Sequence, residues 1–213
     1  MIIAVVSAKG GTGKSTVSLN LAGALSALKK KVLIVDADPQ GSIVQWAEKG
    51  EQKELSVLLE TSPGENRKLR KIARKYDYVI FDSPPTFRKR MRTVISMADM
   101  LIVPVYPGMV DFWSTEKMLE LYFSEKEKRR RLDARLLISR IDRRTRVGRD
   151  FRHYLERLSI PIFMTEISQR VIYNDAWKKS LTVDKLQPKG KAAEDFKLLA
   201  GEVLVWTSKK WLK

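Results

Sequence analysis

The sequence SAKGGTGKST, Ser7–Thr16, decides the fold. It follows the apolar run Ile2–Val6 (IIAVV) and precedes a helical pattern that begins near residue 15. A buried strand, a glycine-rich turn and a helix in this order are the context of a phosphate-binding loop. The glycines let backbone N–H groups turn toward an anion, and the helix N-terminus adds donors and the positive end of its dipole. We therefore predict that this segment cradles phosphate groups.

The end of the loop matches the pattern G-x-x-x-x-G-K-S/T that surrounds a nucleotide. Lys14 is placed to reach the β- and γ-phosphates of a nucleotide, and the Ser15 hydroxyl is placed to bind Mg²⁺. The predicted nucleotide-binding residues of the loop are Lys9, Gly10, Gly11, Thr12, Gly13, Lys14, Ser15 and Thr16.

The start of the loop departs from that pattern. Ala8 stands where the first glycine is expected, and Lys9 follows it directly. A lysine beside Gly10 is too close to the turn to fold back easily onto its own γ-phosphate. Its cation could instead serve a phosphate that another subunit presents.

The rest of the chain alternates short apolar runs with longer amphipathic stretches. This alternation, with continuous rather than alternating apolar runs, predicts an α/β fold with a doubly wound, mainly parallel sheet covered by helices on both faces, in one domain over residues 1–213. Ser62–Glu65 (SPGE) has the composition of a helix start. The expected strands are Ile2–Val6, Lys31–Asp36, Asp77–Asp82, Met100–Val105, Arg135–Ser139 and Pro161–Met164, the expected helices are 15–29, 42–49, 63–75, 88–98, 111–131, 145–158, 168–180 and 191–212, and Leu181–Lys191 is expected to be a loop.

Three carboxylates follow predicted strands. Asp36 and Asp38 come at the end of the second strand, and Asp82 ends the third. The carboxyl ends of parallel strands are where ligands bind in such sheets, so these side chains are expected beside the phosphate loop.

Several segments together resemble one known family. KGGTGKST (Lys9–Thr16) is similar to the deviant Walker A motif of the ParA/MinD family of dimeric P-loop ATPases. The resemblance continues, in the family's order, through VDADPQGS (Val35–Ser42), DYVIFDSPP (Asp77–Pro85), LIVPVYPGMVDFWS (Leu101–Ser114) and ISQRVIYNDA (Ile167–Ala176). It covers nearly the whole chain, and the DADPQ element and the short length point to the small plasmid-partition members of the ParA branch.

The resemblance implies a role for each candidate residue. Lys9 would cross a dimer interface to the partner's nucleotide, and with Lys14 and Asp38 it forms the implied catalytic set. Asp38 would polarise the attacking water. Ser15, Asp36 and Asp82 would hold or support Mg²⁺, and the implied cofactors are ATP and Mg²⁺.

The identity of the base is less constrained by the residues. SRID (Ser139–Asp142) is a partial match to the N/T-K-x-D pattern with which GTPases read guanine. The family places an arginine near this point, which makes Arg140 a candidate contact of adenine. The resemblance favours ATP, and Asp142 leaves GTP as the alternative.

The charge of the chain is strongly basic, with a formal net charge of +16. The segment Lys126–Arg152 contains 12 basic and 4 acidic residues, so half of the excess lies in 27 residues. Such an excess favours a polyanion partner, nucleic acid before anionic lipid. The candidate DNA contacts are Arg129, Arg130, Arg131, Arg143, Arg144, Arg146, Arg149 and, by resemblance, Arg170.

Other features exclude or weaken alternatives. The chain contains no cysteine, which excludes disulfides, thiol catalysis and cysteine-ligated metals. Trp206 and Trp211 near three lysines could form a membrane-surface helix, but Leu199, Val203 and Trp206 have the spacing of residues packed on a core. We expect packing, a cytoplasmic protein without a signal peptide or membrane span, and a surface position for His153.

The sequence thus predicts an ATPase that dimerises on ATP, binds DNA without sequence preference and drives plasmid or chromosome partition near the nucleoid. A ParB-like protein would stimulate hydrolysis. The alternatives are a MinD-type ATPase that works on a membrane surface and a metabolic P-loop nucleotidase of the same superfamily.

Overall fold

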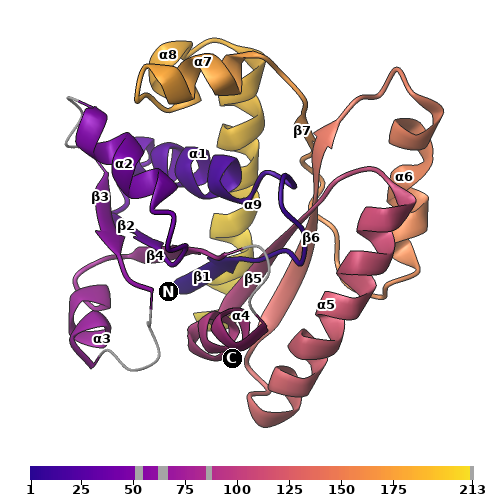
Figure 1. The fold of residues 1–213 in the computed structure, drawn as a ribbon, viewed down its shortest axis with the longest axis horizontal. Helices are drawn as coiled ribbons and strands as arrows, with labels where there is room; N and C mark the ends of the chain where they lie inside the picture. Colours follow the sequence, from indigo (N-terminus) through magenta and orange to yellow (C-terminus); the bar gives the residue numbers. More distant parts are fainter. Residues whose placement is uncertain (51–54, 62–66, 85–87, 212–213) are drawn as a thin grey trace.

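The computed structural model describes residues 1–50, 55–61, 67–84 and 88–211. Its centre is a parallel sheet of seven strands in the order β3-β2-β4-β1-β5-β6-β7 (Figure 1). All the strand pairs are parallel, so the strands share one carboxyl edge and one amino edge. The strands are β1 (Ile2–Val5), β2 (Val32–Asp36), β3 (Ser56–Leu59), β4 (Tyr78–Asp82), β5 (Met100–Val105), β6 (Asp133–Ile141) and β7 (Ile167–Ser168).

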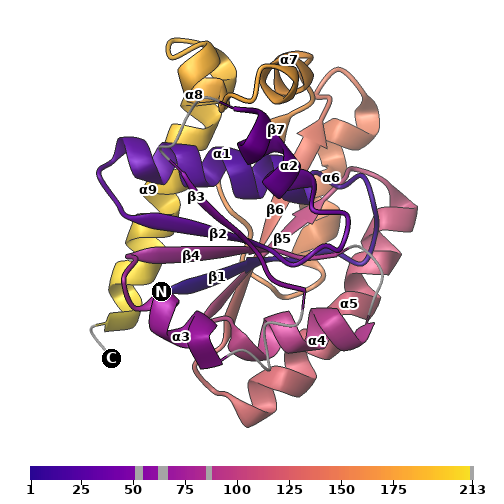
Figure 2. The ribbon, with the colours of Figure 1, turned by 60° about the vertical axis from the view of Figure 1, so that its left-hand side comes forward.

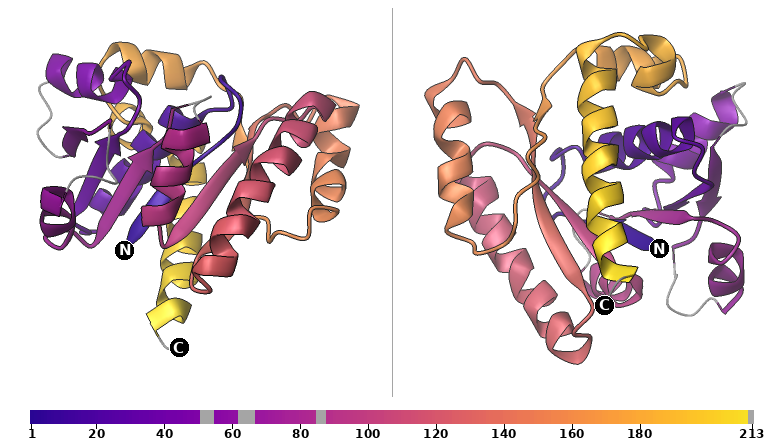
Figure 3. Two further views of the ribbon diagram at one scale, coloured as in Figure 1. Left: turned by 60° about the horizontal axis from the view of Figure 1, so that its bottom comes forward. Right: turned by 180° about the vertical axis from the view of Figure 1, so that it is seen from behind.

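Helices cover both faces of the sheet (Figures 2 and 3). The helices of one face are α1 (Lys14–Ala27), α2 (Ser42–Lys49), α7 (Ile172–Lys178), α8 (Val183–Leu186) and α9 (Lys191–Trp211); those of the other are α3 (Arg67–Ala73), α4 (Arg88–Met97), α5 (Met109–Lys128) and α6 (Arg146–Glu156). Figure 3 shows α9 running across one face, from the side of α7 and α8 down to the edge where β1 begins.

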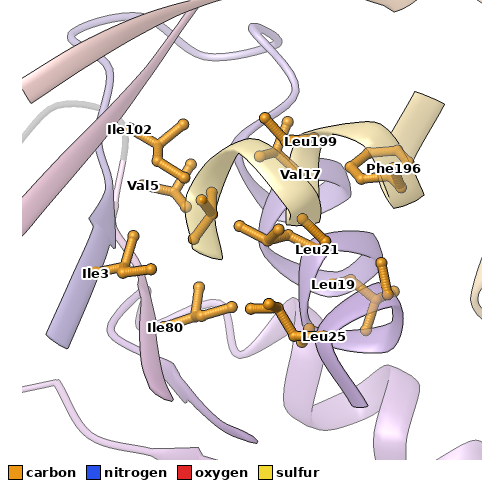
Figure 4. Close-up of a cluster of buried hydrophobic side chains, with 14 of the residues drawn as sticks. Ile3, Val5, Val17, Leu19, Leu21, Leu25, Ile80, Ile102, Phe196 and Leu199 are labelled. Atoms are coloured by element: carbon orange, nitrogen blue, oxygen red, sulfur yellow. The ribbon is translucent and has the colours of Figure 1, made fainter. Parts of the chain in front are cut away.

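The alternation of side chains along β1 feeds two cores. Ile3 and Val5 pack toward α1 and α9, whereas Ala4 packs in the opposite core with the helices of the other face. Figure 4 shows the first core, in which Leu21 of α1 and Leu199 of α9 lie over the sheet. Because both faces are covered, the strands are almost entirely apolar, which explains the continuous runs in the sequence.

Most predicted elements are confirmed, and the errors lie at the margins of the sheet. Five of the predicted strands are confirmed, as β1, β2, β4, β5 and β6. The strand predicted at Pro161–Met164 is wrong: a bridge between Leu136 and Ile162 is the pairing that forms there. The short edge strands β3 and β7 were not predicted, because β3 is partly exposed and β7 has two residues.

The helices also differ from prediction at their ends. The helix predicted over 168–180 is shorter, as α7, because β7 occupies its first residue. The predicted loop Leu181–Lys191 contains the short helix α8. The proposed helix start Ser62–Glu65 lies outside the described residues.

The C-terminal helix packs on the core as expected. Leu199, Val203 and Trp206 are buried, and the Trp206 indole N–H donates to Asp133 at 2.7 Å. The side chain of Trp211 lies outside the described set. His153 is exposed, as predicted. No helix among the described residues is long and apolar enough to cross a membrane.

Candidate nucleotide-binding site

The candidate site lies at the carboxyl edge of the sheet, where β1 ends in the phosphate loop. Asp36 of β2 and Asp82 of β4 are partners in register, and Asp82 is also in register with Val5 of β1. Parallel pairing therefore brings two of the predicted carboxylates beside the loop, although 46 residues separate them in sequence.

The glycines of the loop are needed for two different reasons. Gly11 and Gly13 have φ of 78° and 93°, in the region that favours glycine. A Cβ on Gly13 would also lie 2.8 Å from the Ser139 Oγ. The loop therefore passes close to the end of β6, and a side chain at residue 13 would both strain the backbone and collide with that strand.

The Lys14 ammonium lies inside the loop. The side chain is buried, and its Nζ donates to the Lys9 carbonyl oxygen at 3.2 Å. Burial lowers the pKa of Lys14, while the charges of Asp82 and Asp38 oppose that shift. A buried cation stabilised by nearby carboxylates is suited to binding the phosphate groups of a nucleotide.

Asp82 is held by two hydroxyl groups of α1. Ser15 Oγ donates to Asp82 Oδ2 at 2.6 Å, and Ser18 Oγ donates to Asp82 Oδ1 at 2.9 Å. Burial raises the pKa of Asp82 to about 7, although both hydrogen bonds act in the opposite direction. The Ser15 and Asp82 oxygens are hard donors of the kind that Mg²⁺ prefers, and their role as its ligands stays a prediction. No group of three or more acidic, His or Cys side chains that could hold a metal ion gathers in the described part of the chain.

The other two carboxylates differ in their surroundings. Asp36 is fully buried and accepts N–H groups of Ile43 at 2.9 Å and Val44 at 3.3 Å, at the start of α2. Burial raises its pKa. Asp38 is half-buried and accepts the Gln40 N–H at 3.0 Å. Asp36 thus anchors α2, and its predicted part in the magnesium shell stays a prediction, while Asp38 stands at the mouth of the site.

The second lysine of the loop points away from the phosphate cradle. Lys9 Nζ lies 2.9 Å from Asp111 Oδ2 at the start of α5, and its side chain is 44% exposed. The amino group therefore remains within reach of solvent or of another molecule. The predicted contrast between the two lysines holds in their positions: Lys14 is enclosed by the loop, and Lys9 is not.

A cavity of about 1020 Å³ extends from the loop along the ends of β6 and β7. Arg140 lies over it: its guanidinium donates to the Gly11 carbonyl oxygen and sits 5.5 Å from the centre of the Tyr106 ring. The backbone of Arg140 has φ of 58° within β6, where the pairing of β6 with β7 is irregular between Ser139 and Ile141. Arg140, the predicted contact of the base, therefore lies against the phosphate loop and lines a cavity in which a base could lie.

The partial GTPase match is not supported by the surroundings of Asp142. Arg144 donates to both carboxylate oxygens, from Nε at 2.9 Å and from its terminal nitrogen at 2.7 Å. These hydrogen bonds hold the pKa of Asp142 down, at about 2. A carboxylate already paired with a guanidinium within its own loop is a poor reader of guanine N–H groups.

The basic segment Lys126–Arg152 does not form one surface, and the candidate DNA contacts in it stay predictions. Strand β6 has nine residues, about 30 Å of extended chain, and it carries the segment from one edge of the sheet to the other. Arg129, Arg130 and Arg131 precede β6 at the amino edge. The carboxyl-edge candidates are Arg143, Arg144, Arg146, Arg149 and Arg170.

The carboxyl-edge arginines already have partners within the chain. Arg143 lies 2.6 Å from Glu166, Arg144 is paired with Asp142, and Arg170 lies 3.4 Å from Asp195. Arg146 lies 3.7 Å from Asp150, and Arg149 donates to the Arg144 carbonyl oxygen at 3.0 Å. Two of these pairs, Arg144–Asp142 and Arg146–Asp150, are exposed, and exposed pairs contribute little, so a phosphate could replace the acidic partner there.

Three residues of the site were not predicted from the sequence. Asp111, the partner of Lys9, stands within a segment quoted for its resemblance, but nothing in its spacing marks it. Ser18 follows Ser15 by almost one helical turn, a spacing that places both on one face of α1. Tyr106 directly follows the buried run of β5, and its position at a strand end was the available signal.

The loop, the buried Lys14 and the Ser15–Asp82 pair at the carboxyl edge of a parallel sheet define a P-loop nucleotide-binding protein. Residues 3–183 match the CobQ/CobB/MinD/ParA nucleotide binding domain family. The chain belongs to this family, in which the ParA/MinD-type proteins are P-loop ATPases, and ATP and Mg²⁺ are consistent with it.

Individual relatives cover almost the whole chain. It is 30% identical over 199 residues to Maintenance of carboxysome distribution protein A of Halothiobacillus neapolitanus, spanning 91% of both chains. It is 26% identical to the chromosome-partitioning ATPase Soj of Thermus thermophilus, spanning 95% of this chain and 94% of Soj. Among solved structures, the septum site-determining protein MinD of Pyrococcus horikoshii, complexed with Mg-ADP, shares the fold with a TM-score of 0.79 and 22% identity, over 98% of each chain.

Proposed function

We propose that this chain is an ATP-dependent dimerising ATPase that binds DNA without sequence preference and positions a cargo along it. The observation that carries the proposal is the pair of lysines in one phosphate loop. Lys14 is enclosed by the loop, whereas the Lys9 side chain is 44% exposed and its amino group lies 2.9 Å from Asp111 Oδ2. A cation so placed is suited to a phosphate outside its own loop.

The residues of the site divide the proposed reaction between them. Lys14 and the loop N–H groups bind the phosphates and offset their charge, and Ser15 and Asp82 hold Mg²⁺, which offsets charge on the phosphate oxygens. Asp38 orients the attacking water and accepts its proton, and Arg140 lies against the base. Lys9 of each protomer contacts the nucleotide of the other, so ATP joins two copies.

DNA binding is assigned to the arginines of the carboxyl edge, because they lie on the same side of the sheet as the nucleotide. The ion pairs that Arg144 and Arg146 form with Asp142 and Asp150 are exposed, and dimerisation at this edge would bring two sets of arginines together. DNA binding at this edge is then tied to ATP, and hydrolysis, stimulated by a ParB-like partner protein, releases the DNA from this edge. This proposal implies that the protein is cytoplasmic and associates with the nucleoid.

The alternatives receive different support. For the MinD-type membrane surface, the predicted anchor loses one of its tryptophans, because Trp206 is buried against Phe163 with ring centroids 5.5 Å apart. The relative named for carboxysome distribution, at 30% identity, favours a second candidate cargo: a large protein assembly of that kind in place of a plasmid or chromosome.

The test separates dimerisation from nucleotide binding. Lys9→Ala should retain ATP binding and lose the ATP-dependent dimer measured by light scattering, whereas Lys14→Ala should lose ATP binding itself. Lys197→Ala, which removes an exposed lysine of α9, is the matched control and should dimerise normally. A full ATP-dependent dimer of Lys9→Ala would refute the cross-subunit lysine.

A further inference from the structure

The amino edge of the sheet gathers a second set of cations, far from the nucleotide site. Three turns there, each entering a strand, carry consecutive basic residues: Lys29–Lys31 before β2, Arg74–Lys75 before β4 and Arg129–Arg131 before β6. We call these eight side chains the amino-edge surface. The sequence separates them by up to 102 residues, from Lys29 to Arg131, and the parallel sheet places their turns along one edge.

The acidic residues of the same edge are committed to the backbone and to the core. Asp77 accepts the Lys31 N–H at 2.8 Å, and Asp99 accepts the Ile2 N–H at 2.8 Å. Asp133 accepts the Ala134 N–H at 2.9 Å and the Trp206 indole N–H at 2.7 Å. These carboxylates hold the turns in place, and Arg129 is the one of the eight cations that lies within 4.0 Å of one of them among the described residues.

The cations themselves have few partners. Arg129 donates to the carbonyl oxygens of Ile95 and Ser96 at the end of α4, and lies 4.0 Å from Asp99. Within the described chain, Lys29–Lys31, Arg74–Lys75 and Arg130–Arg131 form no ion pair. The amino edge therefore keeps a positive charge. At the carboxyl edge, in contrast, most of the positive charge is balanced by ion pairs within the chain.

Helix dipoles account for some of the basic residues at this edge, but not for all of them. Helices α1, α3 and α5 end at this edge, and a cation in the last turn of a helix is stabilised by the negative end of the helix dipole. That effect falls off within the last turn, and the three basic residues of Lys29–Lys31 lie beyond the end of α1 at Ala27. Consecutive like charges repel one another, so the dipole alone does not account for triplets.

The dimensions of the surface fit a nucleic acid. The strands β2 and β6 are four strand spacings apart in the sheet, about 19 Å. Duplex DNA carries one negative charge per roughly 1.7 Å of its axis, so the row of turns faces several phosphates at once. A hollow of about 900 Å³ lies along this row, with Lys30, Arg74 and Arg129 in its lining.

The lack of exposed apolar side chains favours DNA over a membrane. Among the described residues of these turns, Leu28, 39% exposed, is the large hydrophobic side chain that reaches the surface. Binding to a lipid surface draws on buried apolar area in addition to charge, whereas the phosphate backbone of DNA is bound by charge alone.

From this arrangement we propose that the amino-edge surface binds the phosphate backbone of duplex DNA, independently of the bound nucleotide. The surface lies within one protomer and needs no dimer. A consequence does rest on the proposed function: if two copies join at their carboxyl edges, their amino edges point away from each other. The ATP dimer would then hold two separate duplexes, one at each end.

The first experiment measures duplex binding by fluorescence anisotropy at several salt concentrations, with ADP and with ATP. In Arg130→Glu/Arg131→Glu, the negative slope of log K against log salt should become shallower by about two in both nucleotide states. Each lost phosphate contact removes roughly 0.9 from the magnitude of the slope. Lys178→Glu/Lys179→Glu, with the same change of charge at the end of α7, should keep its slope. ATP hydrolysis by both variants should equal that of the wild type.

Three outcomes would overturn the proposal: no binding of the wild type with ADP, an unchanged slope in the amino-edge variant, or an equal loss in the α7 control. Pelleting with phosphatidylglycerol vesicles is the companion measurement. Vesicle binding that the amino-edge variant loses, while its DNA slope is unchanged, would assign the surface to lipid and overturn the proposal too.

The second experiment keeps the two proposals apart. Energy transfer between two duplexes with different labels should appear with ATP, and should vanish in Lys9→Ala, while Lys9→Ala still binds one duplex with ADP. If Lys9→Ala dimerises fully, the proposed function fails and the ADP measurement still decides the surface. A dimer that never brings two duplexes together would overturn the bridging consequence.

Discussion

At the carboxyl edge Arg143, Arg144 and Arg170 each pair with an acidic side chain, whereas Lys29–Lys31 and Arg130–Arg131 at the amino edge pair with none of the described residues. The two edges carry similar side chains in different settings. At one edge the charges are balanced around a nucleotide site, and at the other they accumulate. The comparison teaches that a count of basic residues along the chain does not locate a surface, because the direction of each strand decides which edge a turn joins.

The largest expected difference between the edges is in hydrolysis. Asp38→Ala should bind ATP and dimerise, yet hydrolyse ATP about 10²–10⁴-fold more slowly, because one positioned general base is lost. Arg130→Glu/Arg131→Glu, at the amino edge, should hydrolyse at the wild-type rate. Phosphate release under saturating ATP measures both, and normal turnover by Asp38→Ala would remove that residue from its role.

A second difference concerns the stability of the buried carboxylate of the site. Because the folded pKa of Asp82 is raised to about 7 from 3.8, the folded state holds its proton more tightly, and stability falls as pH rises between these values. Without nucleotide, Asp82→Asn should therefore raise the free energy of unfolding by on the order of 2 kcal/mol at pH 8, and the gain should shrink toward pH 4. Calorimetry across this range would contradict the idea if the gain were the same at every pH.

A third change tests whether the carboxyl edge binds DNA only in the ATP state. Replacing Arg146 and Arg149 together by Ala should make the negative slope of log K against log salt shallower by about two with ATP, and leave it unchanged with ADP. The reason is that these residues would meet DNA as part of a dimer joined at this edge. Anisotropy of a labelled duplex gives both slopes, and equal losses in the two nucleotide states would break the distinction between the edges.

The smallest expected effect separates Arg129 from its neighbours. Arg129→Ala removes hydrogen bonds to the carbonyl oxygens at the end of α4, and should lower the free energy of unfolding by about 1 kcal/mol. Arg130→Ala should leave stability within about 0.5 kcal/mol of wild type, since its side chain is exposed. Urea unfolding measures the two, and a larger loss in Arg130→Ala would show a structural contact there.

The sequence by itself determined the phosphate loop, the carboxylates at the ends of the strands and the layered α/β fold. These follow from neighbours along the chain: Gly10–Lys14 act within one turn, and apolar runs between amphipathic stretches indicate a sheet covered on both faces. Asp36, Asp38 and Asp82 could be placed near the loop, because the ends of parallel strands meet at one edge.

Contacts between distant segments were decided by the tertiary structure. Lys9 meets Asp111 across 102 residues, and Ser18 joins Ser15 in holding Asp82 across 64. The short strands β3 and β7 form because neighbouring strands offer hydrogen-bonding partners, which a sequence of two or four residues does not specify. Strand β6 likewise divides a continuous basic segment between opposite edges, because an extended chain of nine residues crosses the whole sheet.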